Sequence, residues 1–311
     1  MTRTRVAVIG GGQNCEHEVS LASAASVAAA LDQRTYQVVP LTIGADGGWR
    51  DGLNQPLGLA SAVKVLAGCD VAMPIVHGPR GEDGTLAALL ELAGIPYVGS
   101  GVRAGALAMD KWATKLVAQA LGLATAPGVL LTAATAAGYA WAGPVVVKPV
   151  AAGSSRGVTL VSEPGLLPVA LREALTLDER VLVEQVVTGR EIDLAVFGTR
   201  VSPALEVLVD GVFDYQAKYG GDAVFRIPAE VTPAARKALE SAALAMYDAL
   251  GCRGVARVDF FLTEDGPVLN EVNTMPGLTA HSQVPRMFAA AGTPYPQLLD
   301  LLVQDALTGR S

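Results

Sequence analysis

Two acidic residues near the C-terminal end of the chain could together bind a divalent cation. Asp259 and Glu271 lie in consecutive apolar stretches, and Asn273 follows two residues later. A three-residue turn at 264–266, with its glycine in the left-handed region, would pair these stretches so that Asp259 faces Glu271 and Arg257 faces Asn273. A two-residue turn would shift the register by one and separate the carboxylates. We expect the three-residue turn.

Opposed carboxylates on neighbouring strands repel each other unless a cation lies between them. Asp259, Glu271 and Asn273 offer oxygen ligands only, which suits magnesium shared with phosphate groups better than zinc. A solvated acidic edge of a sheet is the alternative. Apolar residues alternate with the acidic ones on both strands, which is typical of a half-buried sheet. The pattern therefore favours a metal site.

A second candidate site is the glycine-rich stretch at 148–157. It lies between expected strands at 145–147 and 158–161. Its glycines would allow backbone N–H groups to approach a ligand closely, while Lys148 and the hydroxyls of Ser154 and Ser155 could donate to phosphate oxygens. Taken alone, this stretch could equally be a flexible hairpin with a surface lysine.

Two loops near the N-terminus, at 10–18 and 77–84, follow expected strands. Neither carries the GxGxxG fingerprint, and the chain has no GxxxxGK[ST] motif, so ordinary dinucleotide-binding and P-loop sites are excluded. An acid in such a loop, Glu16, could meet a cationic group of a ligand. It could equally be a helix-start carboxylate that the helix dipole favours.

Alternating strands and helices must position these loops. The pattern over the first hundred residues predicts a doubly wound parallel sheet, whose ligands bind beyond the carboxyl ends of its strands. The expected strands are 6–9, 36–43 and 70–76, and the expected helices are 21–31 and 86–93. Further on, we expect one long helix at 106–121. The uncharged stretch at 128–147 is interrupted by glycine and proline, so we interpret it as a linker plus a strand.

Length and composition describe a folded globular protein of about two or three domains. The chain has 311 residues, 51% of them apolar and 17% charged, and 23 basic against 30 acidic residues give a net charge of −7. The sequence has no cluster of Lys or Arg, which argues against nucleic acid or an anionic membrane as the main partner. Cys15, Cys69 and Cys252 form no CxxC pair, which fits a reducing cytosol. We expect no export signal.

An ordered series of segments, taken together, closely resembles the D-alanine:D-alanine ligases of the ATP-grasp superfamily. These segments are GGQNCEHEVS from Gly11, HGPRGEDGT from His77, YVGSG from Tyr97, MDK at 109–111, KP at 148–149, GSS at 153–155, Glu184, Glu191, YQAKY at 215–219, GCRG at 251–254 and NEVNTMPGLT at 270–279.

The resemblance implies the α/β ATP-grasp fold. An N-terminal doubly wound parallel-sheet domain (1–104) would bind substrate, followed by a small central α+β domain (105–184) and a C-terminal α+β catalytic domain (185–311). It also implies that ATP phosphorylates the carboxylate of one D-alanine and that the amine of a second attacks the acyl phosphate, making a dipeptide for peptidoglycan. A cytoplasmic homodimer is expected, with no nucleic-acid or membrane partner.

The resemblance also assigns roles to single residues. For nucleotide, it implies that Lys111, Lys148 and Lys218 contact ATP, that Ser154 and Ser155 cover the phosphates, and that Glu184, Gln185, Val187 and Glu191 surround adenine and ribose. For metal, it implies that Asp259, Glu271 and Asn273 hold two magnesium or manganese ions. For the substrates and the reaction, it implies roles for Glu16, His77, Ser154, Lys218, Tyr219, Arg257, Gly277, Ser282 and Gln283.

Among these roles, Glu16 would bind the ammonium of the first D-alanine, which His77 would help to orient. Arg257 and the Gly277 N–H would stabilise the tetrahedral intermediate. Ser282 and Lys218 would contact the carboxylate of the second D-alanine. The resemblance makes Tyr219 a lid residue that links Glu16 with Ser154 when the lid closes.

The sequence departs from the family pattern in two regions. Ala151 and Ala152 replace a charged pair before the Gly-Ser-Ser segment, and Arg156 replaces a small apolar residue. Gln283 lies beside the second-substrate pocket, where relatives carry Leu, Met or Arg, and the lid segment 220–226 is short. Retention of the Lys-Tyr pair at 218–219 resembles peptide-forming members and disfavours D-lactate, while D-serine or another amine remains an alternative second substrate.

Overall fold

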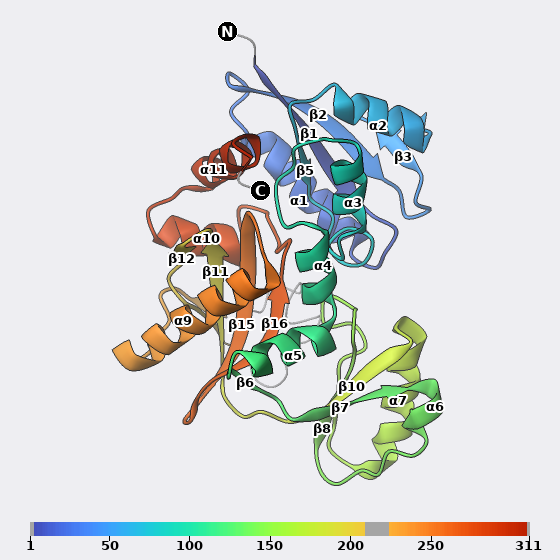
Figure 1. Ribbon diagram of the computed structural model, residues 1–311, viewed down its shortest axis with the longest axis vertical. Coiled ribbons are helices and arrows are strands. Elements are labelled where there is room, and N and C mark those ends of the chain that lie inside the picture. Colours follow the sequence, from blue (N-terminus) through green and yellow to red (C-terminus); the bar gives the residue numbers. More distant parts are fainter. Residues whose placement is uncertain (1–2, 209–223, 310–311) are drawn as a thin grey trace.

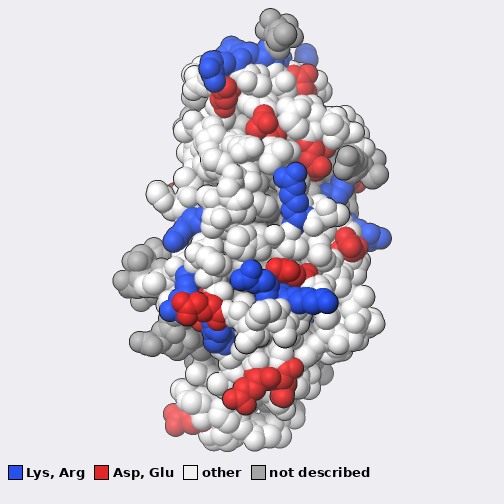
Figure 2. Space-filling model, turned by 90° about the vertical axis from the view of Figure 1, so that its left-hand side faces the viewer, with Lys and Arg blue, Asp and Glu red and all other residues white. Residues whose placement is uncertain are grey.

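The structure is a computed structural model that describes residues 3–208 and 224–309. It contains three β-sheets, with helices packed against them (Figure 1). Every helix within these two ranges is too short or too polar to span a bilayer. The face drawn in Figure 2 carries basic and acidic side chains in small mixed groups on a mostly uncharged surface.

The N-terminal sheet has the strand order β4-β3-β2-β1-β5. The predicted parallel strands are confirmed, because β1 pairs in parallel with both β2 and β5. The sequence missed the antiparallel edge strands β3 and β4 and the helix α2. The bounds are β1 (Thr4–Gly11), α1 (His17–Ala30), β2 (Tyr36–Ile43), β3 (Trp49–Asp51), β4 (Pro56–Leu57), α2 (Leu59–Ala67), β5 (Val71–Pro74) and α3 (Thr85–Leu92).

The predicted single helix at 106–121 is wrong, since two helices, α4 (Val102–Met109) and α5 (Lys111–Ala120), cover this region. Asp110 has an extended backbone between them and caps α5 by accepting the N–H of Ala113 at 2.9 Å. A capping carboxylate starts a new helix even where apolar periodicity continues. The break places Lys111 at the first position of α5.

The central sheet has the order β7-β10-β8-β9. The interpretation of 128–147 as linker plus strand is corrected, because this stretch contains a strand and a one-turn helix before the next strand begins. The predicted strand, glycine loop and strand unit is confirmed by antiparallel β8 and β9. The bounds are β7 (Gly128–Thr132), α6 (Ala133–Ala136), β8 (Val145–Pro149), β9 (Thr159–Val161), η1 (Pro164–Leu166), α7 (Leu167–Leu177) and β10 (Arg180–Gln185).

The third sheet has the order β14-β13-β11-β15-β16-β6, with β12 paired to β11. Helix α9 packs against it, and α10 and α11 connect it to the N-terminal sheet (Figure 1). The bounds are β6 (Ala124–Thr125), β11 (Arg190–Phe197), β12 (Arg200–Val201), β13 (Leu205–Leu208), β14 (Val224–Arg226), α9 (Pro233–Leu250), β15 (Val255–Thr263), β16 (Gly266–Asn273), α10 (Gln283–Ala290) and α11 (Tyr295–Leu307).

The β15–β16 hairpin has the predicted register but not the predicted turn. Thr263 pairs with Gly266, which leaves a two-residue turn, yet Asp259 lies opposite Glu271. The register shifts between Asp259 and Phe260, so that the strand opposite carries one extra residue, Asn270. A β-bulge of this kind restores the pairing that the short turn would otherwise displace. The two carboxylates are therefore opposed, as expected, through a different local structure.

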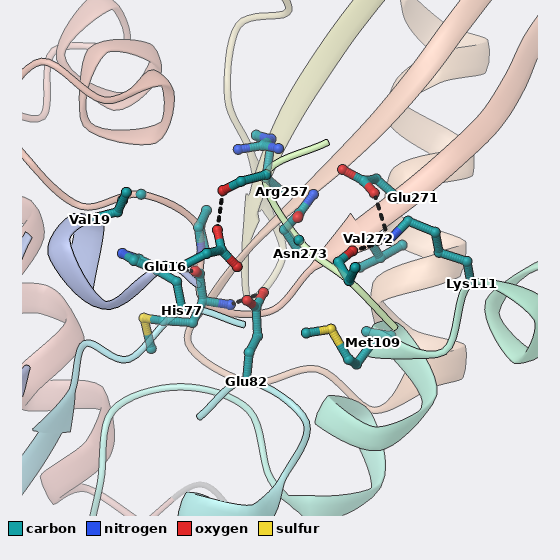
Figure 3. A pocket seen from close by; sticks show the side chains of 17 residues that line it. Glu16, Val19, His77, Glu82, Met109, Lys111, Arg257, Glu271, Val272 and Asn273 are labelled. Carbon is teal, nitrogen blue, oxygen red and sulfur yellow. Dashed lines mark hydrogen bonds and ion pairs between the residues drawn. The ribbon is translucent and has the colours of Figure 1, made fainter. Parts of the chain in front are cut away.

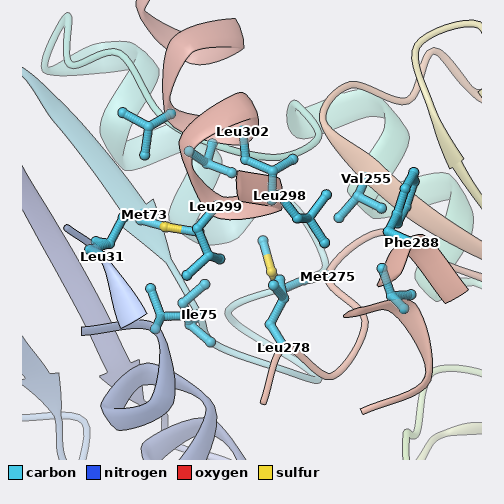
Figure 4. Close-up of a cluster of buried hydrophobic side chains, with 14 of the residues drawn as sticks. Leu31, Met73, Ile75, Val255, Met275, Leu278, Phe288, Leu298, Leu299 and Leu302 are labelled. Atoms are coloured by element: carbon cyan, nitrogen blue, oxygen red, sulfur yellow. The ribbon is translucent and has the colours of Figure 1, made fainter. Parts of the chain in front are cut away.

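A hydrophobic cluster joins the first and third sheets (Figure 4). Met73 of β5 and Ile75, which directly follows β5, pack in one cluster with leucines of α11 and with Met275 and Leu278. Met275 and Leu278 are only 8% and 0% exposed. The segment after β16 is therefore fixed between the two parts of the molecule.

Candidate functional site

Two cavities share part of their walls. The larger, of about 620 Å³, lies between the central sheet and the third sheet. The smaller, of about 60 Å³, lies between the N-terminal loops and the end of β16 (Figure 3). Lys111, Ser154 and Glu271 line both of them. A ligand in the larger cavity could therefore reach a second ligand in the smaller one.

Most of the predicted site residues line one of these cavities. The larger is lined by Lys111, Lys148, Ser154, Ser155, Glu184, Gln185, Val187, Glu191 and Glu271. The smaller is lined by Glu16, His77, Lys111, Ser154, Arg257, Glu271, Asn273 and Gly277. Asp259, Ser282 and Gln283 line neither. Lys218 and Tyr219 lie outside the described residues.

The serines of the glycine loop have an unusual backbone. Ser154 and Ser155 have φ values of 52° and 54°, in the left-handed region that non-glycine residues rarely adopt. Such strain persists where the surroundings enforce it and is common at ligand-binding loops. The Ser154 hydroxyl donates to the carboxylate of Glu16, and a side chain at Gly153 would collide with that carboxylate. The loop thus closes over Glu16.

Asn14 holds the two N-terminal loops together. Its amide nitrogen donates to the carbonyls of His77 at 2.9 Å and Pro79 at 2.8 Å, and its oxygen accepts the N–H of Glu16 at 2.8 Å. Gly78 has a φ of 74°, and a Cβ there would lie 2.6 Å from a Glu16 oxygen. The loops that follow β1 and β5 therefore form one wall around Glu16. Asn14 was not predicted as a site residue from the sequence, although it lies in the segment GGQNCEHEVS.

Arg257 lies between acidic side chains beneath the smaller cavity. Its guanidinium makes two 2.7 Å hydrogen bonds to Asp259 and lies 3.7 Å from Asp193. Burial opposes the charge, but Asp259 and Asp193 raise the pKa of Arg257 well above its ordinary value. The guanidinium therefore stays charged at every accessible pH. Asp193, which the sequence analysis missed, also accepts from the amide of Gln283 at 2.6 Å.

The predicted metal ligands supply an incomplete set. Asp259 and Glu271 are register partners, and the amide nitrogen of Asn273 donates to Asp259 at 3.0 Å. Within the described residues, no group of three or more His, Cys, Asp or Glu side chains is placed to hold a metal ion. Hard divalent cations take about six oxygen ligands, and at phosphate sites the phosphates and water supply most of them. This partial set fits a cation that arrives with a nucleotide.

Family models match nearly the whole chain. The model for the N-terminus of D-Ala–D-Ala ligases matches residues 5–63 and 53–100, and the model for the C-terminus of these ligases matches 123–304. The D-alanine–D-alanine ligases of Mycolicibacterium vanbaalenii and Rhodococcus opacus are each 39% identical over 98% of this chain and 97% of their own length. This chain belongs to the D-alanine–D-alanine ligase family.

Solved structures agree with this assignment. The D-alanine–D-alanine ligase of Bacillus anthracis, complexed with ATP, has a TM-score of 0.82 at 29% identity, with 98% of each chain covered. The VanG D-Ala:D-Ser ligase of Enterococcus faecalis has a TM-score of 0.84 at 33% identity, covering 98% of this chain and 100% of its own. The predicted ATP-grasp fold and the predicted class, an ATP-dependent ligase that acts on small molecules, are both confirmed.

A buried lysine, Lys115, lies behind the wall of the larger cavity and was not predicted from the sequence. The carboxylate of Glu184 is shared by Lys115 at 2.6 Å and Lys148 at 2.7 Å. Burial would raise the pKa of Glu184, but the two lysines more than offset it and lower that pKa. Lys115 follows Lys111 by four residues on α5, so both face the same side of the helix.

Replacing Lys115 with methionine should weaken ATP binding. Glu184 would then have Lys148 as its close cationic partner, which would hold Lys148 away from an incoming phosphate. We expect KM for ATP to rise by about tenfold, as for the loss of one charge-assisted interaction of about 1.4 kcal/mol, with a smaller change in kcat. The matched control is Lys64→Met on the exposed face of α2. Unchanged ATP kinetics in Lys115→Met would contradict this role.

His77 and Glu82 both contact Met275 in the segment after β16. The ring Nδ1 of His77 lies 2.8 Å from the Met275 carbonyl, and Nε2 lies 3.0 Å from the Ser23 hydroxyl. Burial lowers the pKa of His77, so the ring is neutral and Nδ1 carries the proton that the carbonyl accepts. Orientation of the first substrate by His77 stays a prediction, because both ring nitrogens already have protein partners.

Glu82 lines the smaller cavity and was not singled out from the sequence. Its carboxylate accepts the N–H of Met275 at 3.0 Å and the N–H of Gly78 at 3.1 Å. Burial, followed by the nearby charge of Glu16, raises the pKa of Glu82 to about 7. Its place in the quoted HGPRGEDGT segment was a signal that could have identified it.

Proposed function

We propose that this chain joins two D-alanine molecules for peptidoglycan precursor synthesis through a D-alanyl phosphate intermediate. In the first step, a carboxylate oxygen of one D-alanine attacks the γ-phosphorus of ATP, and ADP leaves. In the second, the amine of another D-alanine attacks the acyl carbon, and inorganic phosphate leaves. This chemistry needs charge neutralisation and positioning more than covalent catalysis by the protein.

The observation that carries this proposal is the shared wall of the two cavities. The larger has room for a nucleotide, while the smaller suits a small polar molecule and contains Glu16 and Arg257. Lys111, Ser154 and Glu271 line both. Phosphoryl transfer to a carboxylate requires this arrangement, in which a triphosphate end and an amino acid meet beside cationic and hydroxyl groups.

For the nucleotide, Lys111 and Lys148 would neutralise the phosphates, and Ser154 and Ser155 would donate to them from the glycine loop. Their strained backbone and exposure to the larger cavity support this role. Around the base and ribose, we assign Glu184, Gln185, Val187 and Glu191, all of which line that cavity.

Two magnesium or manganese ions would be held by Glu271, Asp259 and the amide oxygen of Asn273 together with the phosphates. When bound, such ions neutralise charge on the transferring phosphoryl group. The ligand set is oxygen only, as these cations prefer. Lys111, which lies 3.4 Å from Glu271, provides a positive charge at the same place.

For the first D-alanine, Glu16 would accept the ammonium group, and Arg257 and the Gly277 N–H would stabilise the oxyanion of the tetrahedral intermediate. For the second, Ser282 and Lys218 would bind the carboxylate, with Tyr219 closing the lid. The Ser282 hydroxyl lies close to Gly277, because a Cβ added at Gly277 would be only 3.1 Å from it. This position supports a role for Ser282 beside the reacting groups.

D-Serine is the second candidate for the attacking amine. Gln283 is buried and its amide donates to Asp193, which neighbours Arg257, so an uncharged polar side chain lies where relatives carry Leu, Met or Arg. A similar solved structure belongs to a D-Ala:D-Ser ligase. A hydroxyl group on the second substrate would find a polar neighbourhood there.

Product identification should decide between these amines. We expect incubation with ATP, magnesium and a mixture of D-alanine and D-serine to yield D-alanyl-D-alanine as the main dipeptide by mass spectrometry. ADP release should depend on a D-amino acid. Comparing kcat/KM for each second substrate gives the preference. A mixed D-Ala–D-Ser product would establish the alternative, and ADP release that no D-amino acid stimulates would refute both.

We further propose that the protein acts in the cytoplasm as a homodimer. The role of the family in cell-wall precursor synthesis supports the cytoplasmic location. The resemblance to the family supports the homodimer. Light scattering coupled to gel filtration measures the mass in solution. A mass near 31.9 kDa would refute the dimer.

A further inference from the structure

Both peptide groups of Met275 are held by residues of the N-terminal loop at 77–84. Glu82 accepts the Met275 N–H at 3.0 Å, and His77 donates to the Met275 carbonyl at 2.8 Å. The Thr274 hydroxyl adds a longer contact, 3.4 Å, to the Glu82 carbonyl. Met275 lies 193 residues after Glu82 and 198 residues after His77 in the sequence.

His77 and Glu82 are themselves tied down. The His77 ring contacts the Ser23 hydroxyl at 3.0 Å, and its backbone N–H donates to Ser20 at 3.0 Å. The second oxygen of Glu82 accepts the N–H of Gly78 at 3.1 Å. The hold on Met275 therefore rests on the loop after β5 and on helix α1.

Only two backbone dihedral angles, φ and ψ of Pro276, lie between the Met275–Pro276 peptide and the peptide that carries the Gly277 N–H. The hydrogen bond from His77 fixes the plane of the peptide that joins Met275 to Pro276. The proline ring fixes φ of Pro276 near −65°. Only ψ of Pro276 then remains to set the direction of the Gly277 N–H, because that N–H lies in the next peptide plane.

Packing alone would not give this direction. The Met275 and Leu278 side chains are buried in the hydrophobic cluster of Figure 4. Burial of apolar surface is non-directional, however, and hydrogen bonds to backbone groups are directional. The cluster keeps the segment in place, and the two polar contacts orient its peptide planes.

We propose that Glu82 and His77 are positioning residues that clamp the backbone of Met275 and thereby aim the Gly277 N–H into the smaller cavity. Neither side chain needs to touch the reacting atoms in this role. The inference rests on the proposed function, in which the Gly277 N–H stabilises the oxyanion formed when the amine attacks. It explains why an acidic side chain lies within the same cluster as Glu16 (Figure 3).

The experiment compares the two chemical steps in Glu82→Gln. Positional isotope exchange in ATP, measured at a D-alanine concentration low enough to leave the second amino-acid site mostly empty, reports reversible acyl phosphate formation. The dipeptide rate at saturating D-alanine also includes amine attack. Loss of a well-aimed oxyanion donor slows a reaction by about 10²-fold to 10³-fold. We expect dipeptide formation to fall by about 10²-fold, while isotope exchange and KM for ATP change by less than about threefold.

Asp83→Asn is the matched control, because it makes the same chemical change one residue away. Within the described residues, the Asp83 carboxylate accepts hydrogen bonds from its own loop, from the N–H groups of Arg80 at 2.8 Å and Thr85 at 2.9 Å. We expect Asp83→Asn to retain both rates. Equal losses of exchange and dipeptide formation in Glu82→Gln, or no loss of either, would overturn the clamp.

Pro276→Gly provides a second variant that leaves both clamp residues intact. It frees φ of Pro276 and should reproduce the selective loss of dipeptide formation even if Glu82→Gln folds poorly. A wild-type ratio of dipeptide rate to exchange rate in Pro276→Gly would overturn the proposal. Absence of isotope exchange in the wild-type protein would instead count against the proposed function, so the two failures are distinguishable.

Discussion

Replacing Glu271 with glutamine should lower the rate of dipeptide formation by about three orders of magnitude and change ATP affinity far less. Glu271 lines both cavities and lies 3.4 Å from Lys111, so in the proposed reaction its carboxylate would lie where nucleotide and amino acid meet. Glutamine keeps the size but removes the charge that a divalent cation requires, and losing electrostatic stabilisation at the transferring group costs about 10²-fold to 10³-fold or more.

Initial rates of ADP release and calorimetric titration with ATP would measure the two effects separately. Glu264→Gln, on the exposed turn of the same hairpin, is the matched control and should behave like the wild type. A higher magnesium concentration should restore part of the activity of Glu271→Gln if its side chain binds the cation. Wild-type turnover in this variant would refute the assignment of the hairpin.

The same hairpin illustrates how far the sequence could predict the fold. Alternating apolar residues identified β15 and β16, and the opposition of Asp259 and Glu271 was predicted. The turn was predicted wrongly, because a bulge at Asn270 compensates for a shorter turn. A bulge depends on which residues pair across strands, and such pairing leaves only a weak local pattern.

At Asp110, apolar periodicity and a helix-capping residue predict different structures. Apolar periodicity continues from α4 into α5, so it predicted one helix, while the capping carboxylate that divides them was not weighed. The short strands β3 and β4 at the edge of the N-terminal sheet were missed for a related reason. Strands of two or three residues carry too few alternating positions to stand out from a loop.

Many residues that line the two cavities could be identified from the sequence, but the buried partners of those residues could not. Lys148, Glu184 and Arg257 were identified from motifs, and the structure brings each to a cavity. Their buried partners, Lys115 and Asp193, come from distant segments, and nothing in their neighbouring sequence indicates which charge they balance. Three-dimensional packing decides such contacts.

Replacing Arg257 with methionine should reduce kcat/KM by about three orders of magnitude and also destabilise the fold. The guanidinium is 6% exposed, and it holds Asp259 through two hydrogen bonds and Asp193 at 3.7 Å. Removing one partner of a buried ion pair leaves the other charge uncompensated, at a cost of about 3–5 kcal/mol. The loss of a fixed positive charge beside the smaller cavity accounts for the kinetic effect.

Two further variants separate these contributions. Arg257→Lys keeps the charge but cannot form the two parallel hydrogen bonds to Asp259, so it should recover stability more than activity. Arg257→Met combined with Asp193→Asn removes one uncompensated carboxylate and should raise the thermal midpoint above that of the single variant without restoring turnover. Denaturation midpoints and steady-state rates measured on the same preparations would test this. Full activity in Arg257→Lys would show that charge alone suffices and that the geometry of the fork does not matter.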